Sequence, residues 1–129
     1  MKAVILKENG GTDKLIYTED HPMPVIGAND VLVNIKATTV NRADLVIRTG
    51  YPGLALNFPH ILGGDISGVV SDTGSDVKGF SKGDRVVAWS IVSEADDEWA
   101  KRGKAGQSIS WQYFGMHRDG SYAEYAAVP

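Results

Sequence analysis

Cysteine is absent from the 129-residue sequence, which excludes disulfide bonds and metal sites built from thiolates. A chain without cysteine also agrees with the reducing cytoplasm, which is the compartment we expect for it. No apolar run approaches the length of a transmembrane helix, and the first ten residues, MKAVILKENG, lack the apolar segment and cleavage site of a signal peptide. We therefore expect no membrane partner.

An excess of positive charge is missing as well. The sequence has 13 Lys and Arg against 16 Asp and Glu, which gives a formal net charge of -3. A nucleic-acid-binding surface needs a basic patch, so we expect no nucleic-acid partner. The content of 43% hydrophobic and 22% charged residues is ordinary for a globular protein, and the length suits a single domain over residues 1–129.

Most of the sequence has the pattern of short β-strands separated by Gly, Asn and Asp turns. The clearest case is DVLVNIKATTV, in which Val31, Val33 and Ile35 alternate with Leu32 and Asn34, as expected of a half-buried strand. The predicted strands cover residues 2–8, 14–20, 30–40, 66–74, 83–90 and 120–129. This series predicts a mainly β fold, either a small barrel or a sandwich.

Two stretches predict short helices. NRADLVIRTG places Asn41 at the N-cap position and Gly50 at the stop. SEADDEWAKRGK predicts a helix over residues 94–102, because Ser93 can cap it and acidic residues precede basic ones. In that helix Trp99 is expected to face inward, and Glu94 and Asp97 to face water.

The stretch LGGDISGVV, residues 62–70, raises the question of a phosphate-binding loop. The spacing of Gly63, Gly64 and Gly68 does not match G-x-G-x-x-G, and the stretch leads into a strand rather than out of one. We therefore expect no dinucleotide loop. The three histidines have no partner three or four residues away, which favours structural or solvent-exposed roles over metal binding.

Three segments in this order, VNRADLVIRTG, HILGGDISGVVSDTGSDVKGFSKGDRVV and GMHRDGSYAEYAAVP, carry a family resemblance. Together they resemble the N-terminal catalytic domain of the medium-chain dehydrogenase/reductases, which include zinc alcohol dehydrogenases and zinc-independent quinone reductases. The resemblance covers nearly the whole chain. It implies a GroES-like β-barrel with short helices and an inserted helical lobe.

The same resemblance bears on zinc. Asn41, Gly64 and Asp65 stand where the family has the Cys of its catalytic zinc site and the His and Glu of a Gly-His-Glu run. A glycine side chain offers no ligand atom, and an amide oxygen is a poor zinc ligand, so the resemblance implies no catalytic zinc. The four cysteines of the family's structural zinc correspond to Glu94, Asp97, Ala100 and Ser108. We therefore expect the lobe to be held by apolar burial of the aromatic residues around it, namely Trp89, Trp99, Trp111 and Tyr113.

The function that the resemblance implies is hydride transfer from NAD(P)H to a quinone or an α,β-unsaturated carbonyl. Asn41 would donate a hydrogen bond to the carbonyl oxygen; the alternative is that it only caps its helix. Arg42 would contact the cofactor pyrophosphate; the alternative is a solvated helix charge. The small-molecule substrate would lie in a cleft lined by Tyr51, Leu54, Leu56, Phe58 and Asp65.

Relatives continue into a separate nucleotide-binding domain, so we expect this chain to be the first part of a longer protein. That protein would be a homo-oligomer, and the chain alone would be inactive. Two alternatives remain open. One is a stand-alone GroES-like binding or assembly module without catalysis, and the other is an alcohol dehydrogenase-like enzyme with an atypical metal site.

Overall fold

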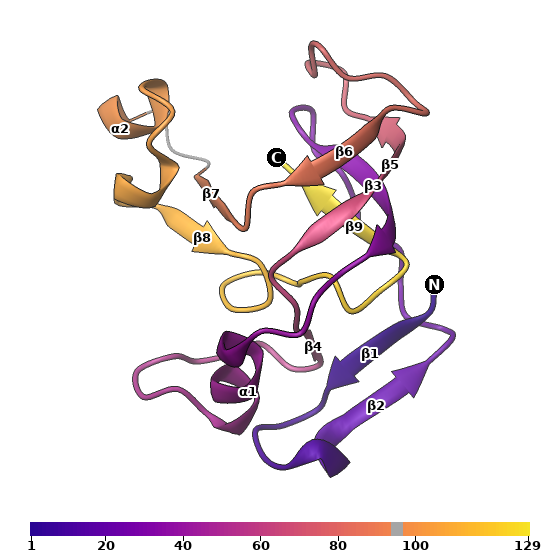
Figure 1. Cartoon of the computed structure of the whole chain (residues 1–129), viewed down its shortest axis with the longest axis vertical. Coiled ribbons are helices and arrows are strands. Elements are labelled where there is room, and N and C mark those ends of the chain that lie inside the picture. The colour runs from indigo at the N-terminus through magenta and orange to yellow at the C-terminus, as the bar shows by residue number, and fades with distance from the viewer. Residues whose placement is uncertain (94–96) are drawn as a thin grey trace.

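A computed structural model describes residues 1–93 and 97–129, which form three antiparallel sheets and two short α-helices (Figure 1). The four-stranded sheet has the order β6-β5-β3-β9, with bounds Arg85–Ala88, Ile66–Thr73, Val31–Ala37 and Tyr125–Val128. The three-stranded sheet has the order β2-β1-β4, with bounds Leu15–Thr18, Ala3–Leu6 and His60–Ile61. The two-stranded sheet pairs β7, Ile91–Ser93, with β8, Trp111–Tyr113. The predicted mainly β fold with short helices is confirmed.

The main core lies under the four-stranded sheet. The alternation predicted for β3 places Val31 and Val33 in this core, and Val33 is paired with Val70 on β5 and with Ala126 on β9. Phe114, which follows β8, is completely buried among them. The core therefore connects the sheet to the segment that leaves the lobe.

A second cluster fixes helix α1, Arg42–Thr49, against the barrel. Leu6 of β1, Ile47 of α1 and Leu62 pack together and are nearly inaccessible to solvent. Asn41 occupies the N-cap position and Gly50 ends the helix with a φ of 103°, a value that favours glycine. The predicted limits of this helix are confirmed.

No helix within the described residues is long and apolar enough to cross a bilayer.

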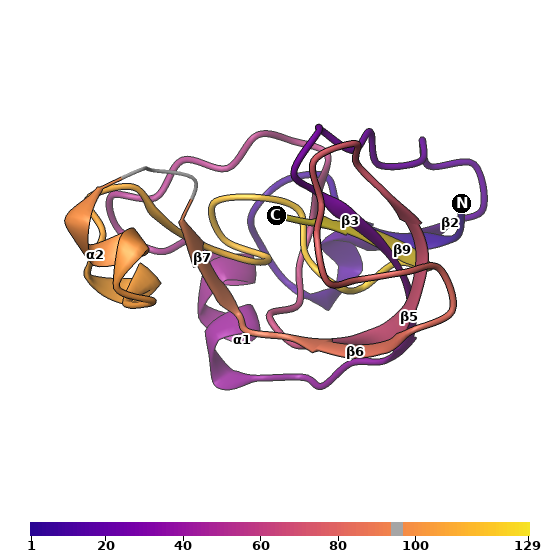
Figure 2. The ribbon, with the colours of Figure 1, turned by 90° about the horizontal axis from the view of Figure 1, so that it is seen from above.

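The lobe projects away from the barrel (Figure 2) and differs from the prediction for residues 94–102. Its helix α2 covers Glu98–Lys101, and the Asp97 carboxylate caps it by accepting the Ala100 N–H at 2.8 Å. Ser93 instead belongs to strand β7, so the prediction that it caps the helix is wrong. Glu94 lies outside the described residues.

Aromatic burial does not hold the lobe, contrary to the prediction. The side chain of Trp99 is 39% exposed, and its ring lies against the cations of Arg102 and Lys104, 6.0 and 5.7 Å from the ring centre. Trp89 and Trp111 are exposed as well, and Trp89 reaches 75%. Flanking cations satisfy the face of an indole ring at the surface, so Trp99 has no need to enter the barrel.

A hydrogen-bonded cluster of serines around Asp97 occupies the centre of the lobe instead. Ser108 is only 2% exposed, and its hydroxyl donates to Asp97 Oδ2 at 2.6 Å and accepts from the Ser93 hydroxyl at 2.6 Å. Ser110 lies 3.0 Å from Ser93 and 3.2 Å from Ser108, oxygen to oxygen. The Ser108 hydroxyl and the Ala100 amide hold the pKa of Asp97 below its usual value. Asp97 was predicted to face water; it is a half-buried hydrogen-bond acceptor.

Replacing Ser108 by alanine is therefore expected to loosen the lobe more than replacing Trp99. Loss of a buried hydroxyl that both donates and accepts costs about tenfold in local opening, so Ser108→Ala speeds amide exchange over residues 97–112 by about that factor. Hydrogen exchange read by NMR measures it, with β3 and β5 as the unaffected reference. Trp99→Ala changes the same amides by less than about threefold, because its ring lies against two surface cations and in no buried apolar cluster. The reverse order would show that the indole holds the lobe.

Candidate functional site

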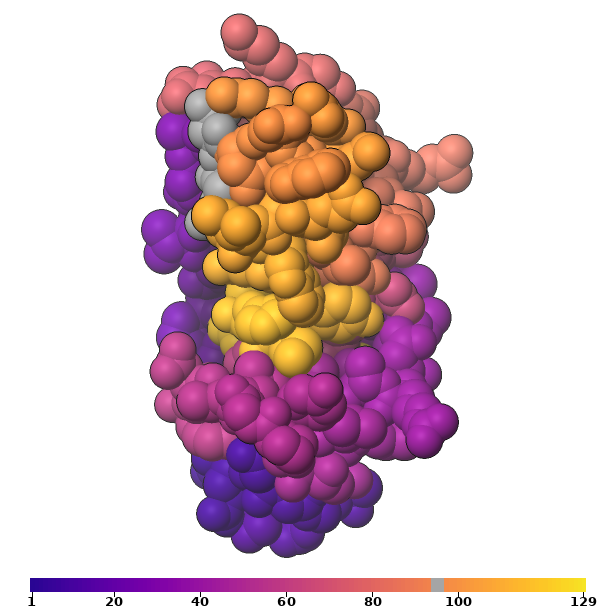
Figure 3. All heavy atoms as spheres, turned by 90° about the vertical axis from the view of Figure 1, so that its left-hand side faces the viewer, coloured from indigo at the N-terminus to yellow at the C-terminus, as the bar shows by residue number. Residues whose placement is uncertain are grey.

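The candidate site lies on the face that joins the lobe to helix α1. On this side of the molecule the lobe, the segment after β8 and the region of α1 follow one another from top to bottom (Figure 3). The residues that the family resemblance singles out, Asn41, Gly64 and Asp65, come from the start of α1 and from the segment that leads into β5.

The start of α1 is fixed by a reciprocal cap. Asn41 and Asp44 are arranged as a capping box, in which the Asp44 carboxylate accepts the Asn41 N–H at 2.7 Å. Asp44 is only 3% exposed, and its carboxylate also accepts the Gly63 N–H at 3.2 Å and the Tyr122 hydroxyl at 3.0 Å. Burial and the nearby Asp44 carboxylate raise the pKa of Tyr122, so this phenol stays protonated and keeps donating.

Asp65 accepts hydrogen bonds from three donors in two parts of the chain. Its carboxylate accepts from the Thr39 hydroxyl, from the Asn41 amide nitrogen at 2.8 Å and from the Ser90 hydroxyl at 3.1 Å. The hydrogen bonds from Thr39 and Asn41, followed by that from Ser90, hold the pKa of Asp65 below its usual value. Asp65 is therefore a fixed anion at neutral pH.

Asn41 occupies the cap position of α1, and its side-chain amide is bonded within the protein. Its amide nitrogen lies 2.8 Å from Asp65 Oδ2 and 3.1 Å from Thr39 Oγ1. An amide nitrogen has two hydrogens to donate, and both have acceptors within the protein. A direct hydrogen bond from Asn41 to a substrate would require one of these bonds to be exchanged.

The glycines before Asp65 leave room for the segment after β8. Gly63 has a φ of +101°, and a β-carbon there would lie 2.4 Å from Ser121 Oγ. A β-carbon on Gly64 would lie 2.5 Å from the Tyr113 hydroxyl oxygen. Both separations are impossible for real atoms, so the backbone of residues 63–64 lies flush against its neighbours. LGGDISGVV is thus a tightly packed approach to strand β5, as its glycine spacing indicated.

These residues do not fit the catalytic zinc of the family. Gly64 supplies no ligand, the Asn41 amide is a poor one, and the space beside Gly64 contains the Tyr113 phenol. Across residues 1–93 and 97–129, no three His, Cys, Asp or Glu side chains are grouped so that they could hold a metal ion. His60 is buried, with its Nδ1 3.4 Å from the Asp119 carboxylate, and His117 accepts the Tyr113 N–H through Nδ1.

The structure divides the predicted substrate cleft. Tyr51 lines a hollow of about 400 Å³ with Arg42 and Met116. Phe58 and Leu56 line a second hollow of about 230 Å³, which shares Met116 with the first. Leu54 and Leu56 also pack against the cluster around Leu6 and Ile47. Asp65 lines neither hollow.

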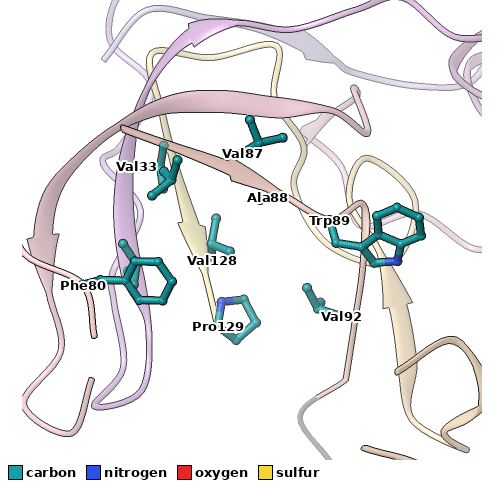
Figure 4. Close-up of a pocket in the computed structure, with 10 residues that line it drawn as sticks. Val33, Phe80, Val87, Ala88, Trp89, Val92, Val128 and Pro129 are labelled. Atoms are coloured by element: carbon teal, nitrogen blue, oxygen red, sulfur yellow. The ribbon is translucent and has the colours of Figure 1, made fainter. Parts of the chain in front are cut away.

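Sequence reasoning missed several features of this face. Thr39 and Ser90 were not identified as partners of Asp65, and Tyr113 was expected to pack the lobe rather than to lie beside Gly64. An apolar groove of about 220 Å³ was missed as well; Val33, Phe80, Trp89 and Val128 lie along it (Figure 4). The strand predicted over residues 83–90 included Trp89 and Ser90, whereas β6 ends at Ala88 and both residues follow it.

Comparison with known proteins shows the family of this chain. The chain matches the family model of the alcohol dehydrogenase GroES-like domain over residues 27–129. It is 34% identical to an NAD-dependent alcohol dehydrogenase of Sulfurisphaera tokodaii, covering 100% of this chain and 38% of that protein. It is 37% identical to the mitochondrial NAD(P)H oxidoreductase RTN4IP1 of Homo sapiens, covering 71% of this chain and 26% of that protein.

A solved structure gives the same result in three dimensions. The cobalt- and zinc-bound thermostable alcohol dehydrogenase from Pyrobaculum aerophilum matches with a TM-score of 0.88 at 30% identity, over 100% of this chain and 39% of that one. The chain thus spans less than two-fifths of each of these proteins. With the capped helix α1 and the sheet order described above, these matches show that the chain belongs to the medium-chain dehydrogenase/reductase superfamily as its N-terminal GroES-like domain.

Proposed function

We propose that this oxidoreductase domain forms the substrate side of an NAD(P)H-dependent enzyme that reduces a quinone or an α,β-unsaturated carbonyl without a catalytic zinc. The observation that carries the proposal is the set of residues at the positions where the family resemblance puts the catalytic zinc site. Gly64 has no ligand atom, Asn41 offers only an amide, and the Asp65 carboxylate already accepts three hydrogen bonds. Alcohol oxidation in this family depends on a metal that acidifies the hydroxyl, whereas hydride addition to an activated carbonyl needs only binding, orientation and a hydrogen bond.

The chain's own residues supply the orientation. A bound nicotinamide cofactor would supply the hydride. Arg42 is exposed at the first position of α1 and borders the hollow that contains Tyr51, and a guanidinium there suits a pyrophosphate. Val46, Tyr51 and Met116 give this hollow an apolar wall that suits a planar substrate. Most of a dinucleotide would have to be bound elsewhere, since these residues contain no phosphate-binding glycine loop.

Asn41 is a positioning residue in this scheme. Its amide fixes Asp65 and, through the capping box, the start of the helix that carries Arg42. The negative charge of Asp65 keeps one position only while its donors hold the carboxylate, and Asn41 is one of these donors. Misplacement of groups around a reacting centre is costly even without loss of a direct contact.

The reaction itself is the first test. Protein expressed from the complete reading frame that contains this chain should oxidise NADH or NADPH when 1,4-naphthoquinone or cyclohex-2-enone is added. Stopped-flow absorbance of the reduced cofactor measures the rate. Sustained oxidation of simple alcohols, with no turnover of quinones or enones, would instead support the alcohol dehydrogenase alternative that the relative of Sulfurisphaera tokodaii suggests.

Zinc content provides a separate test. The same protein is expected to contain much less than one zinc per chain after dialysis against a chelator, because the donor set at residues 41, 64 and 65 is a poor match for the ion. Elemental analysis by plasma mass spectrometry measures this, and the reduction rate should survive the dialysis. One retained zinc per chain, with activity lost on its removal, would contradict the proposal.

The role of Asn41 predicts a paired effect. Asn41→Ala should lower kcat for enone reduction by about tenfold, with little change in KM for the cofactor. It should also raise the pKa of Asp65, because the carboxylate loses a donor that stabilises its charged form. Carboxyl-carbon NMR follows that titration. Ser75→Ala, at a surface serine that bonds Asp76, is the control that should change neither quantity. A shifted pKa with an unchanged kcat would limit Asn41 to a structural role.

A further inference from the structure

The Tyr113 hydroxyl lies where the family resemblance puts a metal-binding side chain. Its oxygen is 2.5 Å, and its ring atoms Cζ and Cε1 are 2.8 and 2.9 Å, from the point that a β-carbon on Gly64 would occupy. The residue at 64 is a glycine, and the phenol fills the volume that a side chain would have taken. A hydroxyl group therefore lies beside the Gly64–Asp65 segment where the family has a histidine.

The backbone around Tyr113 is well fixed. Tyr113 ends β8 and is paired with Ile91 on β7, its N–H donates to His117 Nδ1 at 3.0 Å, and the next N–H, of Phe114, donates to the Ser90 carbonyl at 3.1 Å. Ser90 is itself one of the three donors to Asp65. The phenol is thus attached to a strand end that is hydrogen-bonded to Ser90, a donor to Asp65. This connection holds the phenol in a defined position.

Tyr113 differs from the other donors of this face in having its hydroxyl uncommitted. Thr39, Asn41 and Ser90 donate to Asp65, and the Tyr122 hydroxyl donates to Asp44. Within the part of the chain that the structure describes, the Tyr113 hydroxyl has no hydrogen-bond partner and is not sealed from solvent. A half-buried phenol usually finds a partner, so a ligand oxygen is a fitting acceptor here.

We propose that Tyr113 donates a hydrogen bond to the carbonyl oxygen of the substrate and so does the work that the family assigns to zinc. This inference rests on the proposed function. A bound reduced nicotinamide would supply hydride to the β-carbon of an enone, and the C=C electron pair would then move toward the carbonyl and place negative charge on its oxygen. The Tyr113 hydroxyl stabilises that oxygen, and a proton from water at the α-carbon completes the saturated ketone. The two electrons for this reduction would come from the nicotinamide, which would be left oxidised.

The first experiment is Tyr113→Phe in protein from the complete reading frame. Loss of one donor aimed at a developing oxyanion costs about 10²-fold in kcat, so we expect a fall of that size with little change in KM for NAD(P)H. Tyr17→Phe is the matched control, since Tyr17 lies on the exposed strand β2 and bonds Glu19; its kcat should not change. A fall of less than threefold in Tyr113→Phe would overturn the proposal.

The second experiment displaces the phenol without removing it. In Gly64→Ala the new methyl group would lie 2.5 Å from the Tyr113 oxygen, so the ring has to move. If the phenol acts from its present position, Gly64→Ala should cost about as much as Tyr113→Phe, and the double variant should be no slower than either one. Two independent losses that multiply would show that Tyr113 does not act from beside Gly64, and would overturn the proposal.

A binding measurement separates this proposal from the proposed function. With ¹³Cζ-tyrosine labelling, the Tyr113 resonance is identified by its disappearance in Tyr113→Phe, and cyclohex-2-enone is added with the oxidised cofactor so that nothing reacts. A shift of that resonance supports Tyr113 as the ligand donor even if the wild-type protein reduces no enone or quinone, in which case only the proposed function fails. Reduction by the wild type without a shift overturns Tyr113 and leaves the function standing, and absence of both overturns both.

Discussion

The buried carboxylate of Asp44 is the interaction on which the rest of the site depends. It accepts hydrogen bonds from the backbone of Asn41, the backbone of Gly63 and the hydroxyl of Tyr122. A buried charge is tolerated only when its hydrogen-bonding capacity is used, so these three segments cannot separate without large cost. The start of helix α1 and the approach to strand β5 are thereby held together, and Asn41 can reach Asp65.

In both the lobe and the site, hydrogen bonds to a carboxylate occupy positions where the family resemblance puts metal ligands. In the lobe, Ser108 joins Asp97 to Ser93 through hydroxyl hydrogen bonds of 2.6 Å; in the site, hydroxyls and an amide saturate Asp65. In both places a carboxylate acts as the common centre and small polar residues replace the ligands. Hydrogen bonds to an ionised group are stronger than neutral ones, which makes a carboxylate with several donors an effective local crosslink.

Local sequence patterns predicted strand β3 and helix α1 well, because the causes of these two elements are local, whereas they missed β4, β7 and β8. The alternation of Val31 and Val33 and the pair Asn41 and Gly50 gave β3 and α1 with nearly correct limits. The same logic chose the wrong cap for α2, since Ser93 and Asp97 are both good capping residues and the pairing of β7 with β8 decides between them. Neither the donors of Asp65 nor the placement of Tyr113 beside Gly64 could be predicted, because both depend on contacts between segments far apart in the chain.

The contact between Gly64 and Tyr113 restricts how this domain can evolve. A histidine at 64 would collide with the ring at 113, and a small residue at 113 by itself would leave a void beside Gly64, a defect that destabilises packed interiors. Each change is harmful until the other has occurred. The effects of substitutions at positions 64 and 113 are therefore expected to depend on each other.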